Sequence, residues 1–477
     1  MQLSQLINAG YDAQVEGLTA DSRQVRPGYL FAALPGSKAD GGSYINDALM
    51  HGATIILAKT GTKLPADAKA TLIESDNPRK ELALLASEFY RLQPDVIVAV
   101  TGTSGKTSTV SFTQQLWNLF GISQAASLGT LGMRAPGMMK SGSLTTPDTV
   151  SLHATMADLA AAEITHLAME ASSHGLDQYR LDGVRVSAAG YTNLSRDHLD
   201  YHADMEEYFL AKARLFTEVL QRNGTAVINA DDEYGDRLAV LSLKAGHKVL
   251  TYGQNGKDIR IIERSLVPSG QKLKLSVFGH DYDVVIPLVG EFQVMNALCA
   301  LGLVLSGDGD AQSIVPLLSQ LQGVPGRLQL VSGHPEGAAV YVDYAHKPAA
   351  VEAVLNTLRP HTKGRLVCLL GCGGDRDAGK RPIMGRIASG LSDLVIVTDD
   401  NPRSEDPAAI RAAVLEGAPD ATEIGDRREA IEWAVGNLNK GDVLVIAGKG
   451  HEQGQIIGAT VEPFDDVQVA QESIKKL

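Results

Sequence analysis

The stretch that decides the fold is Val96-Ile-Val-Ala-Val-Thr-Gly-Thr-Ser-Gly-Lys-Thr-Ser-Thr109. Its apolar, β-branched run predicts a strand, its glycines predict a tight turn, and a helix is expected to follow. Backbone N–H groups of such a turn surround phosphate oxygens, while Lys106 offsets their charge and the Thr107 hydroxyl ligates Mg²⁺. The stretch therefore predicts a phosphate-binding loop.

This loop is shorter than a common P-loop. The first glycine of that pattern would stand five positions before Gly105, where the chain has Val100. Gly-Lys-Thr alone occurs by chance, and it is the order of strand, turn and helix that favours a nucleotide site.

Length and charge narrow the class of protein. At about 150 residues per domain, the chain of 477 residues predicts about three domains. The net charge of -13 argues against a nucleic-acid or anionic-membrane partner. No apolar run reaches the 18 or so residues of a membrane span, and the first residues lack the pattern of a signal peptide, so we expect a cytoplasmic protein. The three cysteines form no CxxC pair, which favours reduced, buried thiols over disulfides or zinc.

The first 92 or so residues predict a small α/β domain, with strands near residues 28–34 and 53–58. Asp21-Ser22-Arg23 stands before the first strand and is either a solvated turn or a hydroxyl and an Arg fork presented to an anion. Asp76-Asn-Pro-Arg79 opens an apolar-periodic helix, where Asn as N-cap and Pro at the first helical position are expected.

Polar residues follow the strands of the next region. A strand over residues 166–170 ends in Glu170, which suits a Mg²⁺ held jointly with Thr107. Ser172 follows at once, and Gln178 and Arg180 lie within reach of the same loop. Thr145 and Thr146 precede a turn and either bind a ligand phosphate or cap the following helix.

A second polar cluster, at residues 193–202, follows the strand near residues 188–192. Its two His and two Asp residues, His198 among them, lie within six positions, which favours a functional site. In the next helix, Lys212 falls on the apolar stripe of Tyr208, Phe209, Leu215 and Phe216. Its ammonium group either reaches solvent along its stem or is buried, and burial would make the neutral amine reactive toward CO₂.

A helix beginning near residue 291 carries Asn296, which either reads an adenine edge or bonds within the helix. Pro325-Gly-Arg-Leu328 then forms a linker, and Arg327 in such a hinge suggests a contact made when domains close. Between the two, residues 247–288 alternate as strands do.

The last region, residues 326–477, has three apolar strands near residues 365–370, 393–397 and 442–447. Continuous apolar strands with intervening helices predict a parallel sheet covered on both faces, with ligands at the strand carboxyl ends. Arg376, Asp400, Arg403 and Glu452 follow these strands and are expected to share one pocket. Its mixed charges suit an amino acid with charges at both ends. Asp76-Asn-Pro-Arg79 repeats the letters of Asp400-Asn-Pro-Arg403, but at a helix start.

Several motifs together resemble the Mur ligases of peptidoglycan synthesis, and the resemblance spans the chain. The motifs are Gly102-Thr-Ser-Gly-Lys-Thr107, Glu170-Ala-Ser-Ser-His-Gly-Leu176, Asn193-Leu-Ser-Arg-Asp-His-Leu-Asp200, Pro325-Gly-Arg-Leu328, Asp343-Tyr-Ala-His-Lys-Pro348 and Gly448-Lys-Gly-His-Glu452. The resemblance implies an α/β fold with a UDP-MurNAc-binding domain (1–92), a P-loop-type ATP-binding domain with a mostly parallel sheet (93–325) and a Rossmann-like amino-acid-binding domain (326–477).

The resemblance also implies roles for individual residues, with Lys106, Glu170, His198 and Lys212 as the catalytic set. Two Mg²⁺ ions are expected, with Thr107, Glu170, His198 and Lys212, as a carbamate, as the protein ligands. The positions that match the ATP site are Gly102, Thr103, Ser104, Gly105, Lys106, Thr107, Ser108, Asn296, Arg327, Asp343 and His346. Those that match the site of UDP-N-acetylmuramoyl-L-alanyl-D-glutamate (UDP-MurNAc-dipeptide) are Ser22, Thr145, Thr146, Ser172, Gln178 and Arg180. Those that match the diaminopimelate site are Arg376, Asp400, Asn401, Pro402, Arg403, Gly448 and Glu452.

Within the family, Asp400-Asn-Pro-Arg403 is the form associated with meso-2,6-diaminopimelate rather than L-lysine. The expected reaction is ATP-dependent amide formation through an acyl phosphate, by a monomer. Three alternatives stay open: addition of L-lysine, a folylpolyglutamate-type ligase, which would lack the N-terminal domain, and a module that binds ATP without chemistry.

Overall fold

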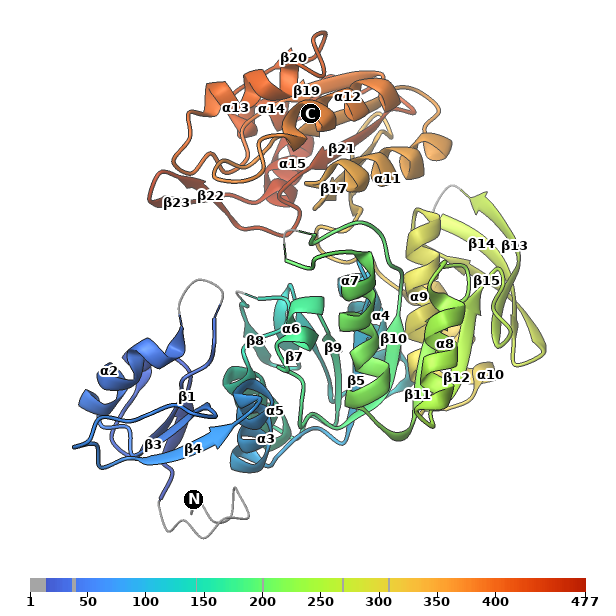
Figure 1. Ribbon diagram of the computed structural model, residues 1–477. Coiled ribbons are helices and arrows are strands. Elements are labelled where there is room, and N and C mark those ends of the chain that lie inside the picture. The colour runs from blue at the N-terminus through green and yellow to red at the C-terminus, as the bar shows by residue number, and fades with distance from the viewer. Residues whose placement is uncertain (1–13, 37–39, 143, 200, 268–269, 308) are drawn as a thin grey trace. The chain divides into compact units, whose positions relative to one another are not determined.

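The computed structural model describes residues 14–36, 40–142, 144–199, 201–267, 270–307 and 309–477 (Figure 1). The chain forms two compact units. The first runs up to Ile262 and includes Lys274–Tyr282 and Met295–Leu318, and the second holds Glu263–Leu273, Asp283–Val294 and Ser319–Leu477. The domain boundaries expected near residues 92 and 325 stay predictions.

The first sheet of unit one is small and parallel, in the order β1 (Gly17–Thr19), β2 (Tyr29–Ala32), β3 (Ile55–Lys59) and β4 (Thr71–Ser75). This confirms the two strands predicted here. Short helices η1 (Ser22–Gln24), η2 (Gly41–Tyr44) and α2 (Ile45–Met50) lie between the strands. Helix α3 (Pro78–Tyr90) begins as predicted, because the Asn77 side chain accepts a hydrogen bond from Lys80 N.

The larger sheet, of which strands β5 to β12 lie in unit one, has the order β15-β14-β13-β12-β11-β10-β5-β9-β6-β7-β8. Its strands are β5 (Val96–Thr101), β6 (Ala125–Gly129), β7 (Gly132–Ala135), β8 (Met138–Lys140), β9 (His166–Glu170), β10 (Val186–Tyr191), β11 (Leu220–Asn229), β12 (Lys248–Gly253), β13 (Ile259–Val267), β14 (Gly270–Val277) and β15 (His280–Ile286). The last four confirm the alternation predicted over residues 247–288. Strand β5 pairs in parallel with both β9 and β10, so the predicted phosphate loop follows a central strand.

The helices between these strands are α4 (Lys106–Phe120), α5 (Thr149–Ala161), α6 (Ser173–Asp177), α7 (Met205–Arg214), η3 (Leu215–Val219) and α8 (Gly235–Lys244). After β15 come α9 (Glu291–Leu305), α10 (Ala311–Ile314) and η4 (Val315–Gln320). The helix expected after the loop is α4, and it ends at Gly121 in the left-handed conformation. It begins directly at Lys106, because Gly105 also adopts a left-handed conformation and turns the loop into the helix.

The sheet of unit two has the order β16-β17-β21-β18-β19-β20, and only β16 is antiparallel to its neighbour. The strands are β16 (Gln329–Val331), β17 (Ala339–Asp343), β18 (Leu366–Leu370), β19 (Leu394–Val397), β20 (Thr422–Glu423) and β21 (Val443–Ala447), and β22 (Gly454–Ile457) and β23 (Thr460–Pro463) form a separate hairpin.

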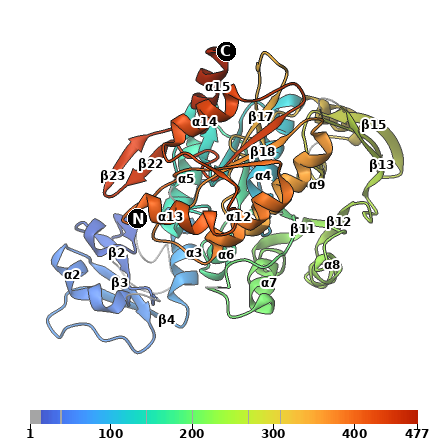
Figure 2. The same cartoon turned by 90° about the horizontal axis from the view of Figure 1, so that it is seen from above.

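Helices cover both faces of the sheet of unit two, as predicted (Figure 1, Figure 2). One face packs against α11 (Pro348–Leu358), α12 (Lys380–Leu391) and α13 (Pro407–Leu415), and η5 (Arg359–His361) follows α11. The other packs against α14 (Arg427–Gly436) and α15 (Asp466–Lys475). The continuous apolar strands predicted this arrangement, since a strand buried on both faces has no polar side to alternate.

The three cysteines are buried free thiols, which agrees with the prediction from their number and spacing. Among the described residues, the structure has no helix with the length and apolar character needed to span a membrane.

Candidate active site

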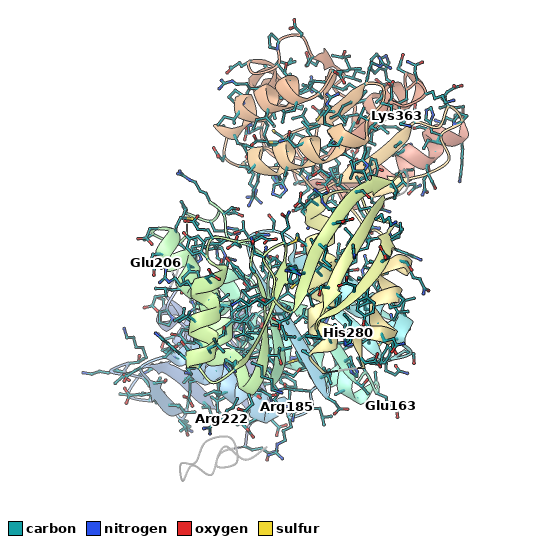
Figure 3. The ribbon with its side chains drawn as sticks, turned by 90° about the vertical axis from the view of Figure 1, so that its right-hand side faces the viewer. Glu163, Arg185, Glu206, Arg222, His280 and Lys363 are labelled. Atoms are coloured by element: carbon teal, nitrogen blue, oxygen red, sulfur yellow. The ribbon has the colours of Figure 1, made fainter. Side chains whose placement is uncertain are left out.

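The candidate site of unit one lies at the carboxyl ends of three neighbouring strands. Glu170 ends β9, the phosphate loop follows β5, and the segment with His198 follows β10. Glu163 and Arg185, which precede β9 and β10, lie at the bottom of this sheet in Figure 3, so the polar loops lie at its opposite edge. Because β5 lies between the other two, Glu170 and His198 follow the strands on either side of the loop.

The phosphate loop is fastened to the segment after β10. Thr103 N donates to Asn193 O at 2.8 Å, Ser104 N donates to Asn193 Oδ1 at 3.0 Å, and Thr192 Oγ1 donates to Ser104 O at 2.6 Å. These three hydrogen bonds fix the conformation of the loop. The loop can therefore keep its shape although it is shorter than a common P-loop and lacks the first glycine of that pattern.

Asn296 of α9 reaches this loop. A Cβ atom on Gly105 would overlap the Asn296 Oδ1, and Gly105 has a φ of 87°. Asn296 therefore lies against the predicted phosphate loop, and both are expected to bind the same ATP molecule. Thr107 and Ser108 are buried in the first turn of α4.

Lys106 folds back onto the loop. Its Nζ donates to Gly102 O at 2.7 Å and to Thr103 O at 3.0 Å. Both bonds tie the Lys106 ammonium group to the backbone of the predicted phosphate loop.

Glu170 is buried, at 2% exposure, and its carboxylate holds Thr130. Oε1 accepts from Thr130 N at 2.8 Å, and Oε2 accepts from Thr130 Oγ1 at 3.2 Å. Glu170 and Thr107 line one small cavity, and their carboxylate and hydroxyl oxygens are the donors that Mg²⁺ prefers. Nowhere in the described part of the chain do three or more His, Cys, Asp or Glu side chains come together as a metal site.

Lys212 is also buried, at 2% exposure. Its Nζ donates to Gly102 O at 2.9 Å and lies 4.4 Å from the centre of the Tyr208 ring. Burial, with the nearby Lys106 charge, holds the Lys212 pKa well below its ordinary value, while Asp197 acts in the opposite direction. The alternative in which this ammonium group reaches solvent is therefore wrong, because α7 turns its apolar face into the core.

His198 lies in a group of aromatic and imidazole rings. Its ring centre is 4.9 Å from that of His174, which lies 4.0 Å from that of Tyr201. His198 Nε2 is 3.6 Å from Asp197 Oδ2, and His198 has a φ of 54°. The polar cluster predicted after β10 is thus packed with the loop after β9, whereas Asp200 of that cluster lies outside the described residues.

Four of the residues matched to the UDP-MurNAc-dipeptide form one network after β9. Thr146 Oγ1 donates to Glu170 O and accepts from Ser172 N, each at 2.9 Å. Arg180 donates to Thr146 O and to Gln178 Oε1, each at 2.7 Å, and burial lowers its pKa.

The capping alternative for the threonines is wrong. Asp148 caps α5 by accepting from Ser151 N, while Thr145 Oγ1 lies 3.2 Å from Thr130 Oγ1. Ser22 lies apart from this network, buried in η1, where Asp21 caps the helix and pairs with the exposed Arg23.

In unit two, Asp343 is tied to the linker of residues 325–328. Its Oδ2 accepts from Leu328 N at 2.7 Å and its Oδ1 accepts from Ala345 N at 2.8 Å, and burial raises its pKa. Gln293 Nε2 donates to Arg327 O at 3.1 Å. The Arg327 guanidinium lies 4.6 Å from the centre of the Tyr344 ring, so the linker is ordered around β17.

His346 follows the same strand, and burial lowers its pKa to about 4. Its Nδ1 lies 2.7 Å from Tyr344 O. The imidazole is neutral at physiological pH. Arg327, Asp343 and His346 belong to unit two, whereas Asn296 and the phosphate loop belong to unit one.

The residues matched to diaminopimelate gather at the carboxyl ends of β18, β19 and β21. Asn401 Nδ2 donates to Glu452 Oε2 at 2.9 Å, and Arg403 Nη1 donates to Gly374 O at 2.8 Å. A Cβ on Gly448, whose φ is 120°, would come 2.8 Å from Asp400 Oδ2. Pro402 continues the segment.

Arg376 belongs to the same group. A Cβ on Gly373 would lie 2.8 Å from Arg403 Nη1 and 3.9 Å from Arg376 Cγ. The residues expected at these strand ends therefore lie near one another, and their sharing of one amino-acid pocket stays a prediction.

Three residues of these sites had no role in the sequence analysis. Lys449 lies among Asp400, Asn401 and Glu452. Its place inside the Gly448–Glu452 motif is the sequence feature that could have indicated a role. Tyr208, whose hydroxyl lies 3.2 Å from Thr103 Oγ1, gave only the signal of a core position. Thr130 had no signal at all.

A strand–loop–helix segment of the phosphate-binding kind beside a buried carboxylate and a buried lysine, together with a second parallel sheet whose strand ends carry side chains of both charges, is typical of nucleotide-dependent enzymes of the α/β class. Three family models match the chain: "Mur ligase family, catalytic domain" at residues 14–90, "Mur ligase middle domain" at 100–304 and "Mur ligase, glutamate ligase domain" at 326–450. The chain belongs to the Mur ligase family.

Relatives match nearly the whole chain. A protein of Rhizobium meliloti (strain 1021) is 54% identical over 95% of this chain and 93% of its own length. One of Chelativorans sp. (strain BNC1) is 51% identical over 98% of this chain and 96% of its own length. Both are named UDP-N-acetylmuramoyl-L-alanyl-D-glutamate--2,6-diaminopimelate ligase. A solved structure of a ligase with that name is 34% identical, covers 100% of this chain and 99% of its own, and has a TM-score of 0.74.

Proposed function

We propose that this chain is the ATP-dependent ligase that joins meso-2,6-diaminopimelate to the D-glutamate γ-carboxylate of UDP-MurNAc-dipeptide, in the cytoplasm. The observation that carries the proposal is the Asp400–Arg403 segment at the end of β19, which lies with Arg376 and Glu452 in one group of opposite charges. Relatives about half identical to the chain have the corresponding name.

The first step transfers the γ-phosphoryl group of ATP to the glutamate γ-carboxylate. A carboxylate oxygen forms a bond to phosphorus, the bond to the bridging oxygen of ADP breaks, and an acyl phosphate results. Both partners are anionic. Lys106 would turn from the Gly102 and Thr103 carbonyls to the phosphates, and the N–H groups at the start of α4 would donate to the same phosphate oxygens.

Mg²⁺ bound by Thr107, Glu170 and His198 would supply further charge screening between these anions. The support for this is the donor set itself, since the Thr107 and Glu170 oxygens line one cavity. Glu170 is also held by two bonds from Thr130, which limits how far its carboxylate can turn.

Lys212 fits a carbamate. Its lowered pKa makes the neutral amine available, so that Nζ can form a bond to the carbon of CO₂ while one C=O π bond breaks and Nζ loses a proton. The product is an anion beside Lys106, which removes the repulsion between two ammonium groups and gives a ligand for a second Mg²⁺.

The second step is attack by the amine of diaminopimelate on the acyl carbon. The C–N bond forms, phosphate leaves and the amine loses a proton. The chain contributes position rather than a covalent nucleophile: Arg403 and Arg376 suit the carboxylates of the amino acid, and Asp400 and Glu452 suit its second ammonium group. We propose that six residues bind the UDP-MurNAc-dipeptide: Ser22, Thr145, Thr146, Ser172, Gln178 and Arg180.

One assay tests the proposal. The purified protein is given UDP-MurNAc-dipeptide, ATP, Mg²⁺ and either meso-diaminopimelate or L-lysine, and ADP and the amide product are measured. We expect ADP and tripeptide with diaminopimelate. Turnover with lysine alone would overturn the choice of amino acid, and ATP binding without ADP release would indicate a binding module.

A further inference from the structure

Lys449 has a fully buried ammonium group, with its side chain at 0% exposure. It follows Gly448, directly after β21. Its Nζ donates to Asn401 Oδ1 at 2.9 Å and lies 3.7 Å from Asp400 Oδ1 and 3.6 Å from Glu452 Oε2. One cation therefore stands between the two carboxylates of the pocket.

The other charged groups that act on Lys449 belong to a buried ion pair. Arg427 Nε donates to Asp466 Oδ1 at 2.8 Å, and Arg427 Nη2 donates to Ala447 O at 3.1 Å. Burial lowers the Lys449 pKa, and Asp400, Glu452 and Asp466 oppose this while Arg427 adds to it. Burying an ammonium group costs free energy unless nearby carboxylates compensate its charge. The position of the Lys449 ammonium group and the positions of the Asp400 and Glu452 carboxylates therefore depend on one another.

The Asn401 side chain links Lys449 to Glu452 by hydrogen bonds. Its Oδ1 accepts from Lys449 Nζ and from Ile456 N, each at 2.9 Å, so its Nδ2 points the other way. That nitrogen donates to Glu452 Oε2. Without the Lys449 donor, the amide would lose one of the two bonds that orient its oxygen, and Asp400 and Glu452 would lose the ammonium group that lies within 3.7 Å of each.

We propose that Lys449 is a positioning residue that determines which amino acid the pocket accepts. It attracts both Asp400 and Glu452 and so fixes where their carboxylates lie, and the outward oxygens of these carboxylates then receive an ammonium group of the substrate. An amine held between carboxylates stays protonated and cannot attack, so this group is the amine remote from the reacting one. The inference rests on the proposed function and adds to it a residue that acts on the substrate only through Asp400, Asn401 and Glu452.

The test compares two amino acids of the same length. Diaminopimelate has a second amine and 2-aminopimelate does not, while both have two carboxylates. For Lys449→Met we expect the KM for diaminopimelate to rise about tenfold, in keeping with the loss of a charged hydrogen bond. The KM values for 2-aminopimelate and for ATP should change less than about twofold, because neither substrate needs the ammonium site. Lys440→Met, at an exposed lysine, is the matched control and should change none of them.

Lys449→Gln keeps a donor for Asn401 and is expected to fold, with a smaller rise confined to diaminopimelate. Thermal unfolding is measured for each variant. An equal rise in KM for both amino acids, or an unchanged KM for diaminopimelate in both Lys449 variants, would overturn the inference. Absence of ADP release by the unaltered enzyme with diaminopimelate would instead overturn the proposed function.

Discussion

Lys106 and Lys212 donate to the same carbonyl oxygen, that of Gly102, at 2.7 and 2.9 Å. Two ammonium groups on one acceptor repel each other, and the carbonyl alone cannot offset both charges. The arrangement favours loss of a proton from the more deeply buried group, Lys212.

We therefore expect Lys212→Met to abolish activity, by about 100-fold or more, and not to reduce stability. The Lys212 pKa is lowered from 10.5, so folding disfavours its protonated form, and its contribution to stability becomes less unfavourable as pH rises toward 10.5. Methionine removes this penalty at pH 7.5. Thermal unfolding in CO₂-free buffer measures the stability. Short carboxylates should restore part of the activity, and full activity without them would exclude the carbamate.

Gly105→Ala should impair ATP binding. The new methyl group meets the Asn296 carboxamide, and a φ of 87° strains any residue with a side chain. We expect the KM for ATP to rise about tenfold and the stability to fall by about 1–2 kcal/mol. Gly121→Ala is the control, since Gly121 has a φ of 103° but no atom within 4 Å of the added Cβ. If both variants raise the KM for ATP equally, backbone strain and not the Asn296 contact is responsible.

Arg403→Ala should raise the KM for diaminopimelate at least about tenfold, because a charged hydrogen-bond partner of the amino acid is lost. The KM for ATP should stay within about twofold. Steady-state kinetics at saturating UDP-MurNAc-dipeptide measure both. Arg428→Ala, which breaks an exposed pair with Glu472, serves as the control and should leave both values unchanged. An unchanged amino-acid KM in Arg403→Ala would remove this residue from the pocket.

Acid should destabilise unit one through His153. Its ring is buried against Asp182 O, and burial lowers its pKa from 6.5 to about 4. Between these values the unfolded chain binds the proton and the folded one does not. The contribution of His153 is therefore complete above pH 6.5 and is lost as pH falls toward 4, by up to about 3 kcal/mol. Urea unfolding at pH 7.5 and 5.0 should show a smaller pH effect in His153→Gln, and an identical effect would assign the loss to other groups.

The sequence predicted those features of the fold that depend on residues close together in the chain. Asn77 before Pro78 caps α3 and the apolar run before Gly371 forms the buried strand β18, because helix caps and burial on both faces of a strand each depend on a few neighbouring residues. The strand ends also indicated which polar groups gather, since parallel strands share an edge.

Partners distant in sequence could not be predicted in this way. Thr146 bonds to Glu170 and Ser172 rather than capping α5, because a loop more than twenty residues away supplies better partners. The burial of Lys212 depends on how α7 packs, and the contact of Asn296 with Gly105 joins elements far apart in the chain. The roles proposed for these residues stay predictions.

The hydrogen bonds that Asp343 accepts from Leu328 N and Ala345 N decide where the chain can be divided into fragments. Because Tyr344 N also donates to Gly326 O, residues 326–328 are hydrogen-bonded to the end of β17 and belong to the C-terminal fragment. A cut after Leu328 would leave a buried carboxylate oxygen of Asp343 without its donor, which is costly in an apolar surrounding. A C-terminal fragment meant to fold by itself should therefore begin ahead of Gly326 and keep Arg327.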